Sequence, residues 1–213
     1  MRGCGGGWLD LRLRIGALVA LAMALGPAGG EEPSGTFEIL DDSFEAPDIT
    51  GKADIDPPGW KREHSYSRVW DENTGLFTTP FGAQAIAAWS GTGFQTTNLT
   101  DVLQPGTTYT LTFNVGNCDA DTGNPRSDNQ YTAELLVGTN TVASVSGLTN
   151  TDDLSQSNSV VLATGDAHPQ LGQKLGIRLR MTGGDWHALA LFDNVRLVAR
   201  ESNEWARSLF YGK

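Results

Sequence analysis

The chain has 213 residues with 25 acidic against 15 basic side chains, which gives a formal net charge of −10. Such an acidic surface repels phosphate backbones and anionic headgroups, so nucleic acids and anionic membranes are excluded as partners.

The first thirty residues predict a secretory signal peptide. Arg2, Arg12 and Arg14 precede the apolar run "IGALVALAMAL", and the small residues "GPAGG" follow it. This run is shorter than the roughly 20 residues of a membrane-spanning helix, which favours a cleaved signal over an uncleaved N-terminal anchor. We therefore expect cleavage at residues 28–30 and export to the cell surface or the extracellular space. The exported part then holds one cysteine, Cys118, and no intrachain disulfide.

Residues 31–200 predict one all-β domain, followed by a C-terminal tail at 201–213. Short segments of alternating polarity recur between turn signals, and the one at 107–116 places Tyr109, Leu111 and Phe113 on one face. In chain order, the candidate strands are 36–41, 83–89, 94–98, 107–116, 130–138, 141–147, 159–164, 174–181 and 188–199. We expect a hairpin turn at "GTN" and long loops at 46–60 and 116–129. Strands at this spacing favour a two-sheet antiparallel sandwich over separate domains.

Five short patterns carry a resemblance to a known fold. They are "SFE" at 43–45, "PPGW" at 57–60, "LQPGTTYTLTFNVG" at 103–116, "LGQKLGIRLR" at 171–180 and "DNVRL" at 193–197. In this order the chain resembles the galactose-binding-like jelly-roll domains, which include many non-catalytic carbohydrate-binding modules and exported domains of bacterial surface proteins. The resemblance implies a jelly-roll β-sandwich in which the first and last strands meet at one edge.

Asp193 stands inside the apolar strand pattern around "FDNVRL" and needs a partner, because a buried unpaired carboxylate is costly. The resemblance implies a structural Ca²⁺ at the meeting strands, held by Glu45, Asp193 and main-chain carbonyls. Calcium prefers such oxygen ligands. Asp41 is a further candidate ligand and is favoured over Asp42, because in a strand it shares a side with Glu45. The alternative is that main-chain N–H groups or water satisfy Asp193.

Two tryptophans are candidates for a ligand site. Sugar rings stack on exposed aromatic rings while polar neighbours bind their hydroxyls. Trp70 is followed by Asp71 and Asn73, and Trp186 by His187, while Arg126 lies in a polar loop. We therefore predict these six residues as ligand-binding, with plain packing of both rings as the alternative.

No catalytic motif is visible in the sequence. The three histidines form neither an HExxH pair nor a zinc spacing, and no GxSxG elbow or Gly-rich phosphate loop accompanies them. A pair of acids that meets only in space stays open. The sequence thus predicts a monomeric, non-enzymatic, exported module that binds carbohydrate or a cell-surface glycan. The alternative is a structural or adhesive surface protein without a small-molecule ligand.

Overall fold

The computed structural model describes residues 35–124, 126, 129–149, 151–185 and 187–201. The predicted signal peptide and residues 202–213 of the predicted tail lie outside this part, so cleavage and export stay predictions. The described residues form strands and a short 3-10 helix, η1 (Glu72–Thr74). None of the helices in this part is long and apolar enough to cross a membrane.

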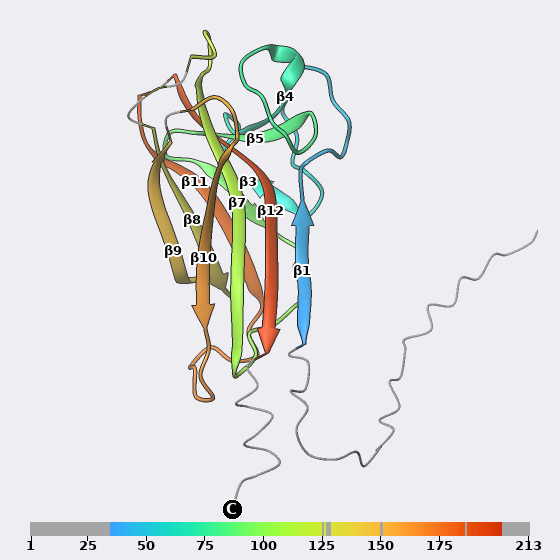
Figure 1. The fold of residues 1–213 in the computed structure, drawn as a ribbon, viewed down its shortest axis with the longest axis vertical. Helices are drawn as coiled ribbons and strands as arrows, with labels where there is room; N and C mark the ends of the chain where they lie inside the picture. Colours follow the sequence, from blue (N-terminus) through green and yellow to red (C-terminus); the bar gives the residue numbers. More distant parts are fainter. Residues whose placement is uncertain (1–34, 125, 127–128, 150, 186, 202–213) are drawn as a thin grey trace, which may run out of the picture. The chain divides into compact units, whose positions relative to one another are not determined.

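The described strands form two antiparallel sheets that pack face to face (Figure 1). The first sheet has the order β10–β7–β12–β5–β4–β2, with β1 also paired to β12; its strands are β1 (Thr36–Asp42), β2 (Lys52–Ala53), β4 (Arg68–Asp71), β5 (Gln84–Trp89), β7 (Thr107–Asp119), β10 (Gln156–Ala163) and β12 (Ala188–Glu201). The second has the order β3–β6–β11–β8–β9, with β3 (Trp60–Arg62), β6 (Gly93–Thr96), β8 (Asn129–Val137), β9 (Asn140–Thr149) and β11 (Leu175–Gly183). The predicted all-β jelly-roll sandwich is confirmed.

The two ends of the domain pair with each other. β1 runs antiparallel to β12, with Thr36 opposite Arg200 and Asp42 opposite Val195 (Figure 1). Earlier in β12, residues 189–192 pair with β5 in place of β1, while β7 pairs with β12 on its other side. The change of partner coincides with a β-bulge after Asp193, where Asn194 adopts a φ of 48°. Asparagine tolerates this left-handed conformation better than most residues, so the "DN" pair is suited to the bend.

Three short strands were missed by the sequence analysis. β2 and the first residue of β3 fall in the segment predicted as a loop, and β4 follows soon after. With two to four residues each, these strands are too short to show an alternating pattern. The predicted hairpin between β8 and β9 is confirmed, with Gly138 at a φ of 60° in the turn.

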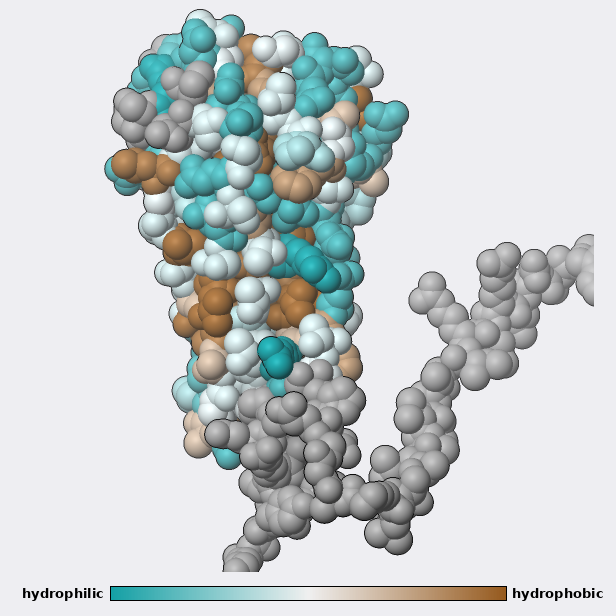
Figure 2. Space-filling view, in the orientation of Figure 1, coloured by the Kyte–Doolittle hydropathy of each residue, from teal (hydrophilic) through white to brown (hydrophobic). Residues whose placement is uncertain are grey.

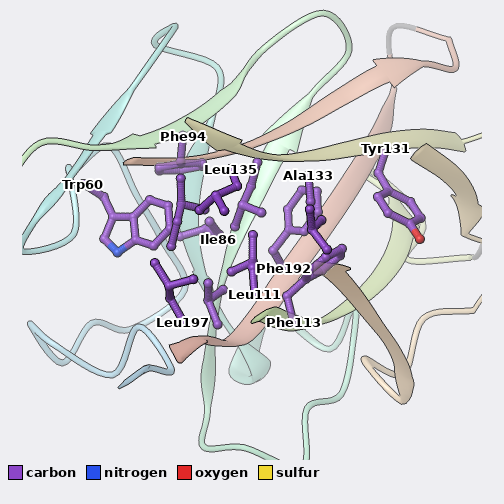
Figure 3. Close-up of a cluster of buried hydrophobic side chains, with 14 of the residues drawn as sticks. Trp60, Ile86, Phe94, Leu111, Phe113, Tyr131, Ala133, Leu135, Phe192 and Leu197 are labelled. Carbon is purple, nitrogen blue, oxygen red and sulfur yellow. The ribbon is translucent and has the colours of Figure 1, made fainter. Parts of the chain in front are cut away.

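The main hydrophobic core fills the space between the two sheets (Figure 3). At its centre, the ring centroid of Phe192 lies 6.0 Å from that of Phe113 and 6.2 Å from that of Tyr131. Burial of apolar surface, to which aromatic side chains contribute large areas, is the dominant favourable contribution to folding.

A second apolar cluster lies on the opposite face of the first sheet. We call it the outer cluster; it consists of Trp70, Phe77, Ala85, Ala87, Cys118, Leu154, Leu189 and Leu191. On β5, Ile86 and Ala88 point into the main core, whereas their neighbours Ala85 and Ala87 point into the outer cluster. Two segments supply covering side chains: the β4–β5 connection (72–83) provides Phe77 and the β9–β10 connection (151–155) provides Leu154. We call these segments the covering connections.

The surface of the described residues is mixed in polarity. Hydrophilic residues gather over the loops at the upper end in Figure 2, and hydrophobic ones are interspersed over the strands below. The side chain of Val161 on β10, for example, is 57% exposed.

Candidate functional site

Asp193 lies at the bulge of β12 and is fully buried. Its Oδ2 accepts a hydrogen bond from the hydroxyl of Thr79, which belongs to the β4–β5 connection. Its Oδ1 accepts one from the main-chain N–H of Asn194 at 2.6 Å. The structure thus shows the hydrogen-bonded alternative that the sequence left open for this carboxyl.

The pKa of Asp193 is raised from 3.8 to about 7, mainly by burial and to a smaller extent by the nearby charges of Glu45 and Asp42, against the effect of the two hydrogen bonds. The buried carboxyl therefore holds its proton close to neutral pH. A proton donor of this kind is a recurrent feature of active sites.

The stability of the protein should reflect this pKa. An acid whose pKa is higher in the folded state binds its proton more tightly there, so the free energy of unfolding falls as pH rises from about 4 to about 7. The shift corresponds to about 4 kcal/mol at most. The Asp193→Asn variant does not titrate here, so its stability relative to wild type should increase from pH 4.5 to pH 8. Urea unfolding of both proteins at both pH values measures this change. If the stability difference between variant and wild type is the same at pH 4.5 and pH 8, the raised pKa of Asp193 is contradicted.

Side-chain hydrogen bonds connect the bulge to the covering connections. The Nδ2 of Asn194 donates to Oδ1 of Asn114 at 3.1 Å, and the Nδ2 of Asn114 donates to the carbonyl of Leu154 at 2.9 Å. The N–H of Leu154 in turn donates to the carbonyl of Thr78 at 3.0 Å. The strand that carries Asp193 and both covering connections are therefore fixed to one another.

Small residues of the first sheet lie beneath the covering connections. Ala85 and Ala87 belong to the outer cluster, and Gly116 stands nearby on β7. A Cβ atom at Gly116 would lie 3.2 Å from the carbonyl oxygen of Thr151 and 3.4 Å from Cγ of Leu154. Leu154 thus packs directly onto a stretch of sheet with little side-chain volume. Displacement of Leu154 would open an apolar space at this place.

Cys118 is the one thiol of the described residues and also belongs to the outer cluster. Burial raises the pKa of this thiol to about 12. Only the thiolate is a strong nucleophile, so Cys118 acts as an apolar side chain at neutral pH.

Glu45 fixes the end of the β4–β5 connection. Its Oε1 accepts hydrogen bonds from the main-chain N–H groups of Ala83 at 3.0 Å and Gln84 at 2.8 Å. Gly82 has a φ of 142°, a conformation that favours glycine, and a Cβ atom there would overlap the Glu45 carboxylate in its present position. Glu45 thereby anchors the connection that presents Thr79 to Asp193.

Of the two aspartates on β1, the structure brings Asp42 toward the site. Its Oδ2 accepts the indole N–H of Trp60 at 2.8 Å and its Oδ1 accepts the N–H of Phe44 at 2.8 Å. Asp41, which the sequence analysis favoured, is exposed and lies opposite Arg196 in the register. The charge that acts on Asp193 is accordingly that of Asp42, together with Glu45.

The predicted ligand residues near η1 are largely buried. Trp70 is 2% exposed and packs in the outer cluster, with Nζ of Lys52 at 4.1 Å from its ring centroid. The side chain of Asp71 is buried and caps η1, accepting the N–H of the exposed Asn73 at 2.7 Å. Trp70 therefore has no exposed face on which a sugar ring could stack. Trp186 lies outside the described residues.

The remaining predicted ligand residues are engaged in ion pairs near the ends of β7 and β12. The guanidinium of Arg126 contacts Asp119, with Nη1 at 2.7 Å from Oδ2, and also Asp185. Nδ1 of His187 lies 2.9 Å from a carboxylate oxygen of Asp121. Arg126 and His187 are thus both engaged with acidic partners from the chain itself.

Lys52 connects this group to Trp70. Its Nζ lies over the Trp70 ring and donates to the carbonyl of Ala120 at 3.2 Å, and the N–H of Ala120 donates to the carbonyl of His187 at 2.9 Å.

The sequence analysis missed the residues that complete the surroundings of Asp193. Thr79 and Phe77 lie in "GLFTTPFG" and Leu154 lies in "TDDLS", both of which have loop composition. One signal was available: the alanine-rich "AQAIAAW" has no polar face, which is typical of a strand covered on both sides.

A shallow depression of about 390 Å³ lies elsewhere, over β3 and β6 of the second sheet; it is lined by Lys61, Arg62, Glu63, Gln95, Thr96 and Thr97. Its carboxyl, Glu63, is exposed and paired with Arg180 at 2.8 Å. This lining offers no buried acid, in contrast to the surroundings of Asp193.

Comparison with known proteins identifies the family. Residues 36–198 match the HpiC1-like family, which is described as HpiC1 cyclase. The chain belongs to this family. The match spans nearly all of the β-sandwich, from β1 to the end of β12. No curated protein matches the chain.

Solved structures agree with the family. The Stig cyclase Fisc from Fischerella sp. TAU, in complex with (3Z)-3-(1-methyl-2-pyrrolidinylidene)-3H-indole, is 26% identical with a TM-score of 0.65; the match covers 79% of this chain and 100% of that chain. A cyclase from Fischerella sp. TAU in complex with 4-(1H-indol-3-yl)butan-2-one is 27% identical with a TM-score of 0.66, and the match covers 78% and 98%. An arabinose-bound α-L-arabinofuranosidase, MgGH51, is 13% identical with a TM-score of 0.51 over 76% of this chain and 26% of that chain, which shows a likeness of fold alone.

Family membership corrects the functional predictions. The non-catalytic carbohydrate-binding module, its structural or adhesive alternative and the glycan partner are wrong, because the matching family and the similar structures at 26–27% identity are cyclases. The error arose because one fold hosts both sugar-binding modules and cyclases, and the resemblance concerned the fold.

Proposed function

We propose that this protein is a cyclase that closes a ring in a small, largely apolar molecule, with Asp193 as the acid. The observation that carries the proposal is a fully buried carboxyl with a pKa of about 7, on the sheet face that also bears the outer cluster. An apolar site with a few placed polar groups suits such a ligand.

The chemistry requires no co-reactant. The protonated Asp193 gives its proton to an unsaturated carbon or nitrogen of the substrate, which leaves a cationic carbon. An electron-rich carbon of the same molecule attacks this centre and forms the ring bond. Loss of a proton from the attacking carbon to the Asp193 carboxylate restores the acid, so product and substrate are isomers. The apolar surroundings exclude water, which would otherwise trap the cation.

An indole is the ligand class that the relatives favour, since both similar cyclases are in complex with indole compounds. In this chain the ligand would displace Phe77 and Leu154 of the covering connections and occupy the space over Ala85, Ala87 and Gly116.

Isothermal titration calorimetry with 4-(1H-indol-3-yl)butan-2-one tests this function. We expect saturable binding of the indole ketone and none of an oligosaccharide panel. Binding of a sugar without binding of the indole would overturn the proposal.

Calcium at Glu45 and Asp193 remains our proposal for a cofactor, as an alternative to the acid role of Asp193, because a carboxylate that binds calcium holds no proton to donate. The pairing of β1 with β12 supports it, because it brings Glu45 close enough for its charge to act on Asp193. Among the described residues, no group of three or more acidic, histidine or cysteine side chains is arranged to hold a metal. Main-chain carbonyls and water would therefore have to supply most of the six to eight oxygen ligands that Ca²⁺ takes.

If calcium binds there, saturating calcium should raise the melting temperature by about 5–10 °C over chelator, because a ligand that binds only the folded state stabilises it. The Asp193→Asn variant should lose this response. Calcium would also hold Asp193 ionised and remove the pH dependence expected for the buried acid. Identical melts of the wild type in calcium and in chelator would exclude the site.

A further inference from the structure

Two buried tryptophans differ in whether their indole N–H groups have a hydrogen-bond acceptor. The N–H of Trp60 donates to Oδ2 of Asp42 at 2.8 Å. The Nε1 of Trp70 is inaccessible to solvent, yet it has no hydrogen-bond acceptor in the part of the chain that the structure describes. A buried donor without an acceptor lowers stability. A phenylalanine would fill much of the same space without this cost.

The surroundings of Trp70 limit where an acceptor can come from. The ring lies on β4 among the outer cluster, and Lys52 on β2 covers it at 4.1 Å from the ring centroid. Lysine carries only hydrogen-bond donors and cannot accept the indole proton. Water does not reach the buried nitrogen. The ring belongs to the outer cluster, where the ligand of the proposed cyclase would bind, so that ligand can supply the acceptor.

We propose that the indole N–H of Trp70 donates a hydrogen bond to a carbonyl oxygen or an imine nitrogen of the bound ligand. This inference rests on the proposed function and narrows its ligand class to apolar molecules that carry one such acceptor. Trp70 then orients the ligand at one end while Asp193 acts on it at another. The role differs from ring stacking, because the N–H group and not an exposed ring face makes the contact.

The test compares two ligands in three proteins. The ligands are 4-(1H-indol-3-yl)butan-2-one, which has a ketone acceptor, and 3-butyl-1H-indole, which lacks it. The proteins are the wild type, Trp70→Phe and the matched control Trp60→Phe. Calorimetry gives the ratio of the two dissociation constants in each protein. The general difference in hydrophobicity between the two ligands is the same in all three proteins. A change of the ratio from one protein to another therefore reports the contact with the ketone.

We expect Trp70→Phe to shift this ratio about 3- to 10-fold against the ketone, as for the loss of one hydrogen bond, and Trp60→Phe to leave it unchanged. The melting temperature of Trp70→Phe should equal or exceed that of the wild type, because an unpaired buried donor is removed. That of Trp60→Phe should fall, because the bond to Asp42 is lost.

Three results would overturn the inferred hydrogen bond between the Trp70 N–H group and the ligand. If Trp70→Phe binds both ligands with the same ratio of dissociation constants as the wild type, the hydrogen bond from Trp70 to the ligand is excluded. The proposed cyclase function is not affected by that result. A clear loss of melting temperature in Trp70→Phe without a change in ratio would assign the N–H a structural role. If the wild type binds neither indole, indoles are excluded as the ligand class of the proposed function, and the hydrogen bond from Trp70 is excluded with them.

Discussion

Replacement of Asp193 by asparagine should reduce cyclase turnover by about 100- to 10 000-fold, the usual contribution of a positioned general acid. Asparagine matches aspartate in shape: its Oδ1 can accept from the N–H of Asn194 and its Nδ2 can donate to the hydroxyl of Thr79, but it carries no acidic proton. The fold should persist, because a neutral amide is less costly to bury than a carboxylate. Turnover of 3-alkenylindoles that also carry a carbonyl oxygen or an imine nitrogen, followed by mass-resolved chromatography of the cyclised isomers, measures the effect.

Asp166→Asn is the matched control for this prediction. Asp166 is exposed in the connection between β10 and β11, so its replacement should change turnover less than twofold. If Asp193→Asn retained more than a tenth of wild-type turnover, another group would have to supply the proton.

The largest effect on stability is expected for Phe192→Ala, which should lower the free energy of unfolding by about 3–5 kcal/mol. Phe192 is fully buried between the sheets and contacts Phe113 and Tyr131. Its removal leaves a cavity that the strands on either side cannot close, because each is held in register by its neighbours.

Urea unfolding measures this loss, with Val161→Ala as control. Val161 is 57% exposed on the outer face of β10, so its truncation should cost about 0.5 kcal/mol or less. A loss below about 1 kcal/mol for Phe192→Ala would contradict the packing described for the main core.

The fold could be predicted from the sequence because its strands carry strong local signals. The alternation of Tyr109, Leu111 and Phe113 with threonines fixes the inward face of β7, and the structure buries these three side chains in the main core. The pairing of the first and last strands was predicted from resemblance and is confirmed by the register of β1 with β12. The short strands β2 to β4 carry no such pattern and were missed.

The site could be predicted only in part. Asp193 was singled out because a carboxyl among apolar residues needs a partner, and the structure confirms its burial. Its partner, Thr79, comes from 114 positions earlier in the chain and from a segment of loop composition, so no local pattern could indicate it. Trp70 was a candidate for ligand contact with plain packing as the alternative, and the structure shows packing, because the covering connections fold over the outer face of the first sheet and bury the ring.

The most direct test of the account is a crystal structure of this protein soaked with 4-(1H-indol-3-yl)butan-2-one. The account predicts the ligand over Ala85 and Ala87 of the outer cluster, with Phe77 or Leu154 displaced and the Asp193 carboxyl within contact distance. A ligand seated in the depression over β3 and β6, beside Arg62 and Thr96 and out of contact with Asp193, would contradict it.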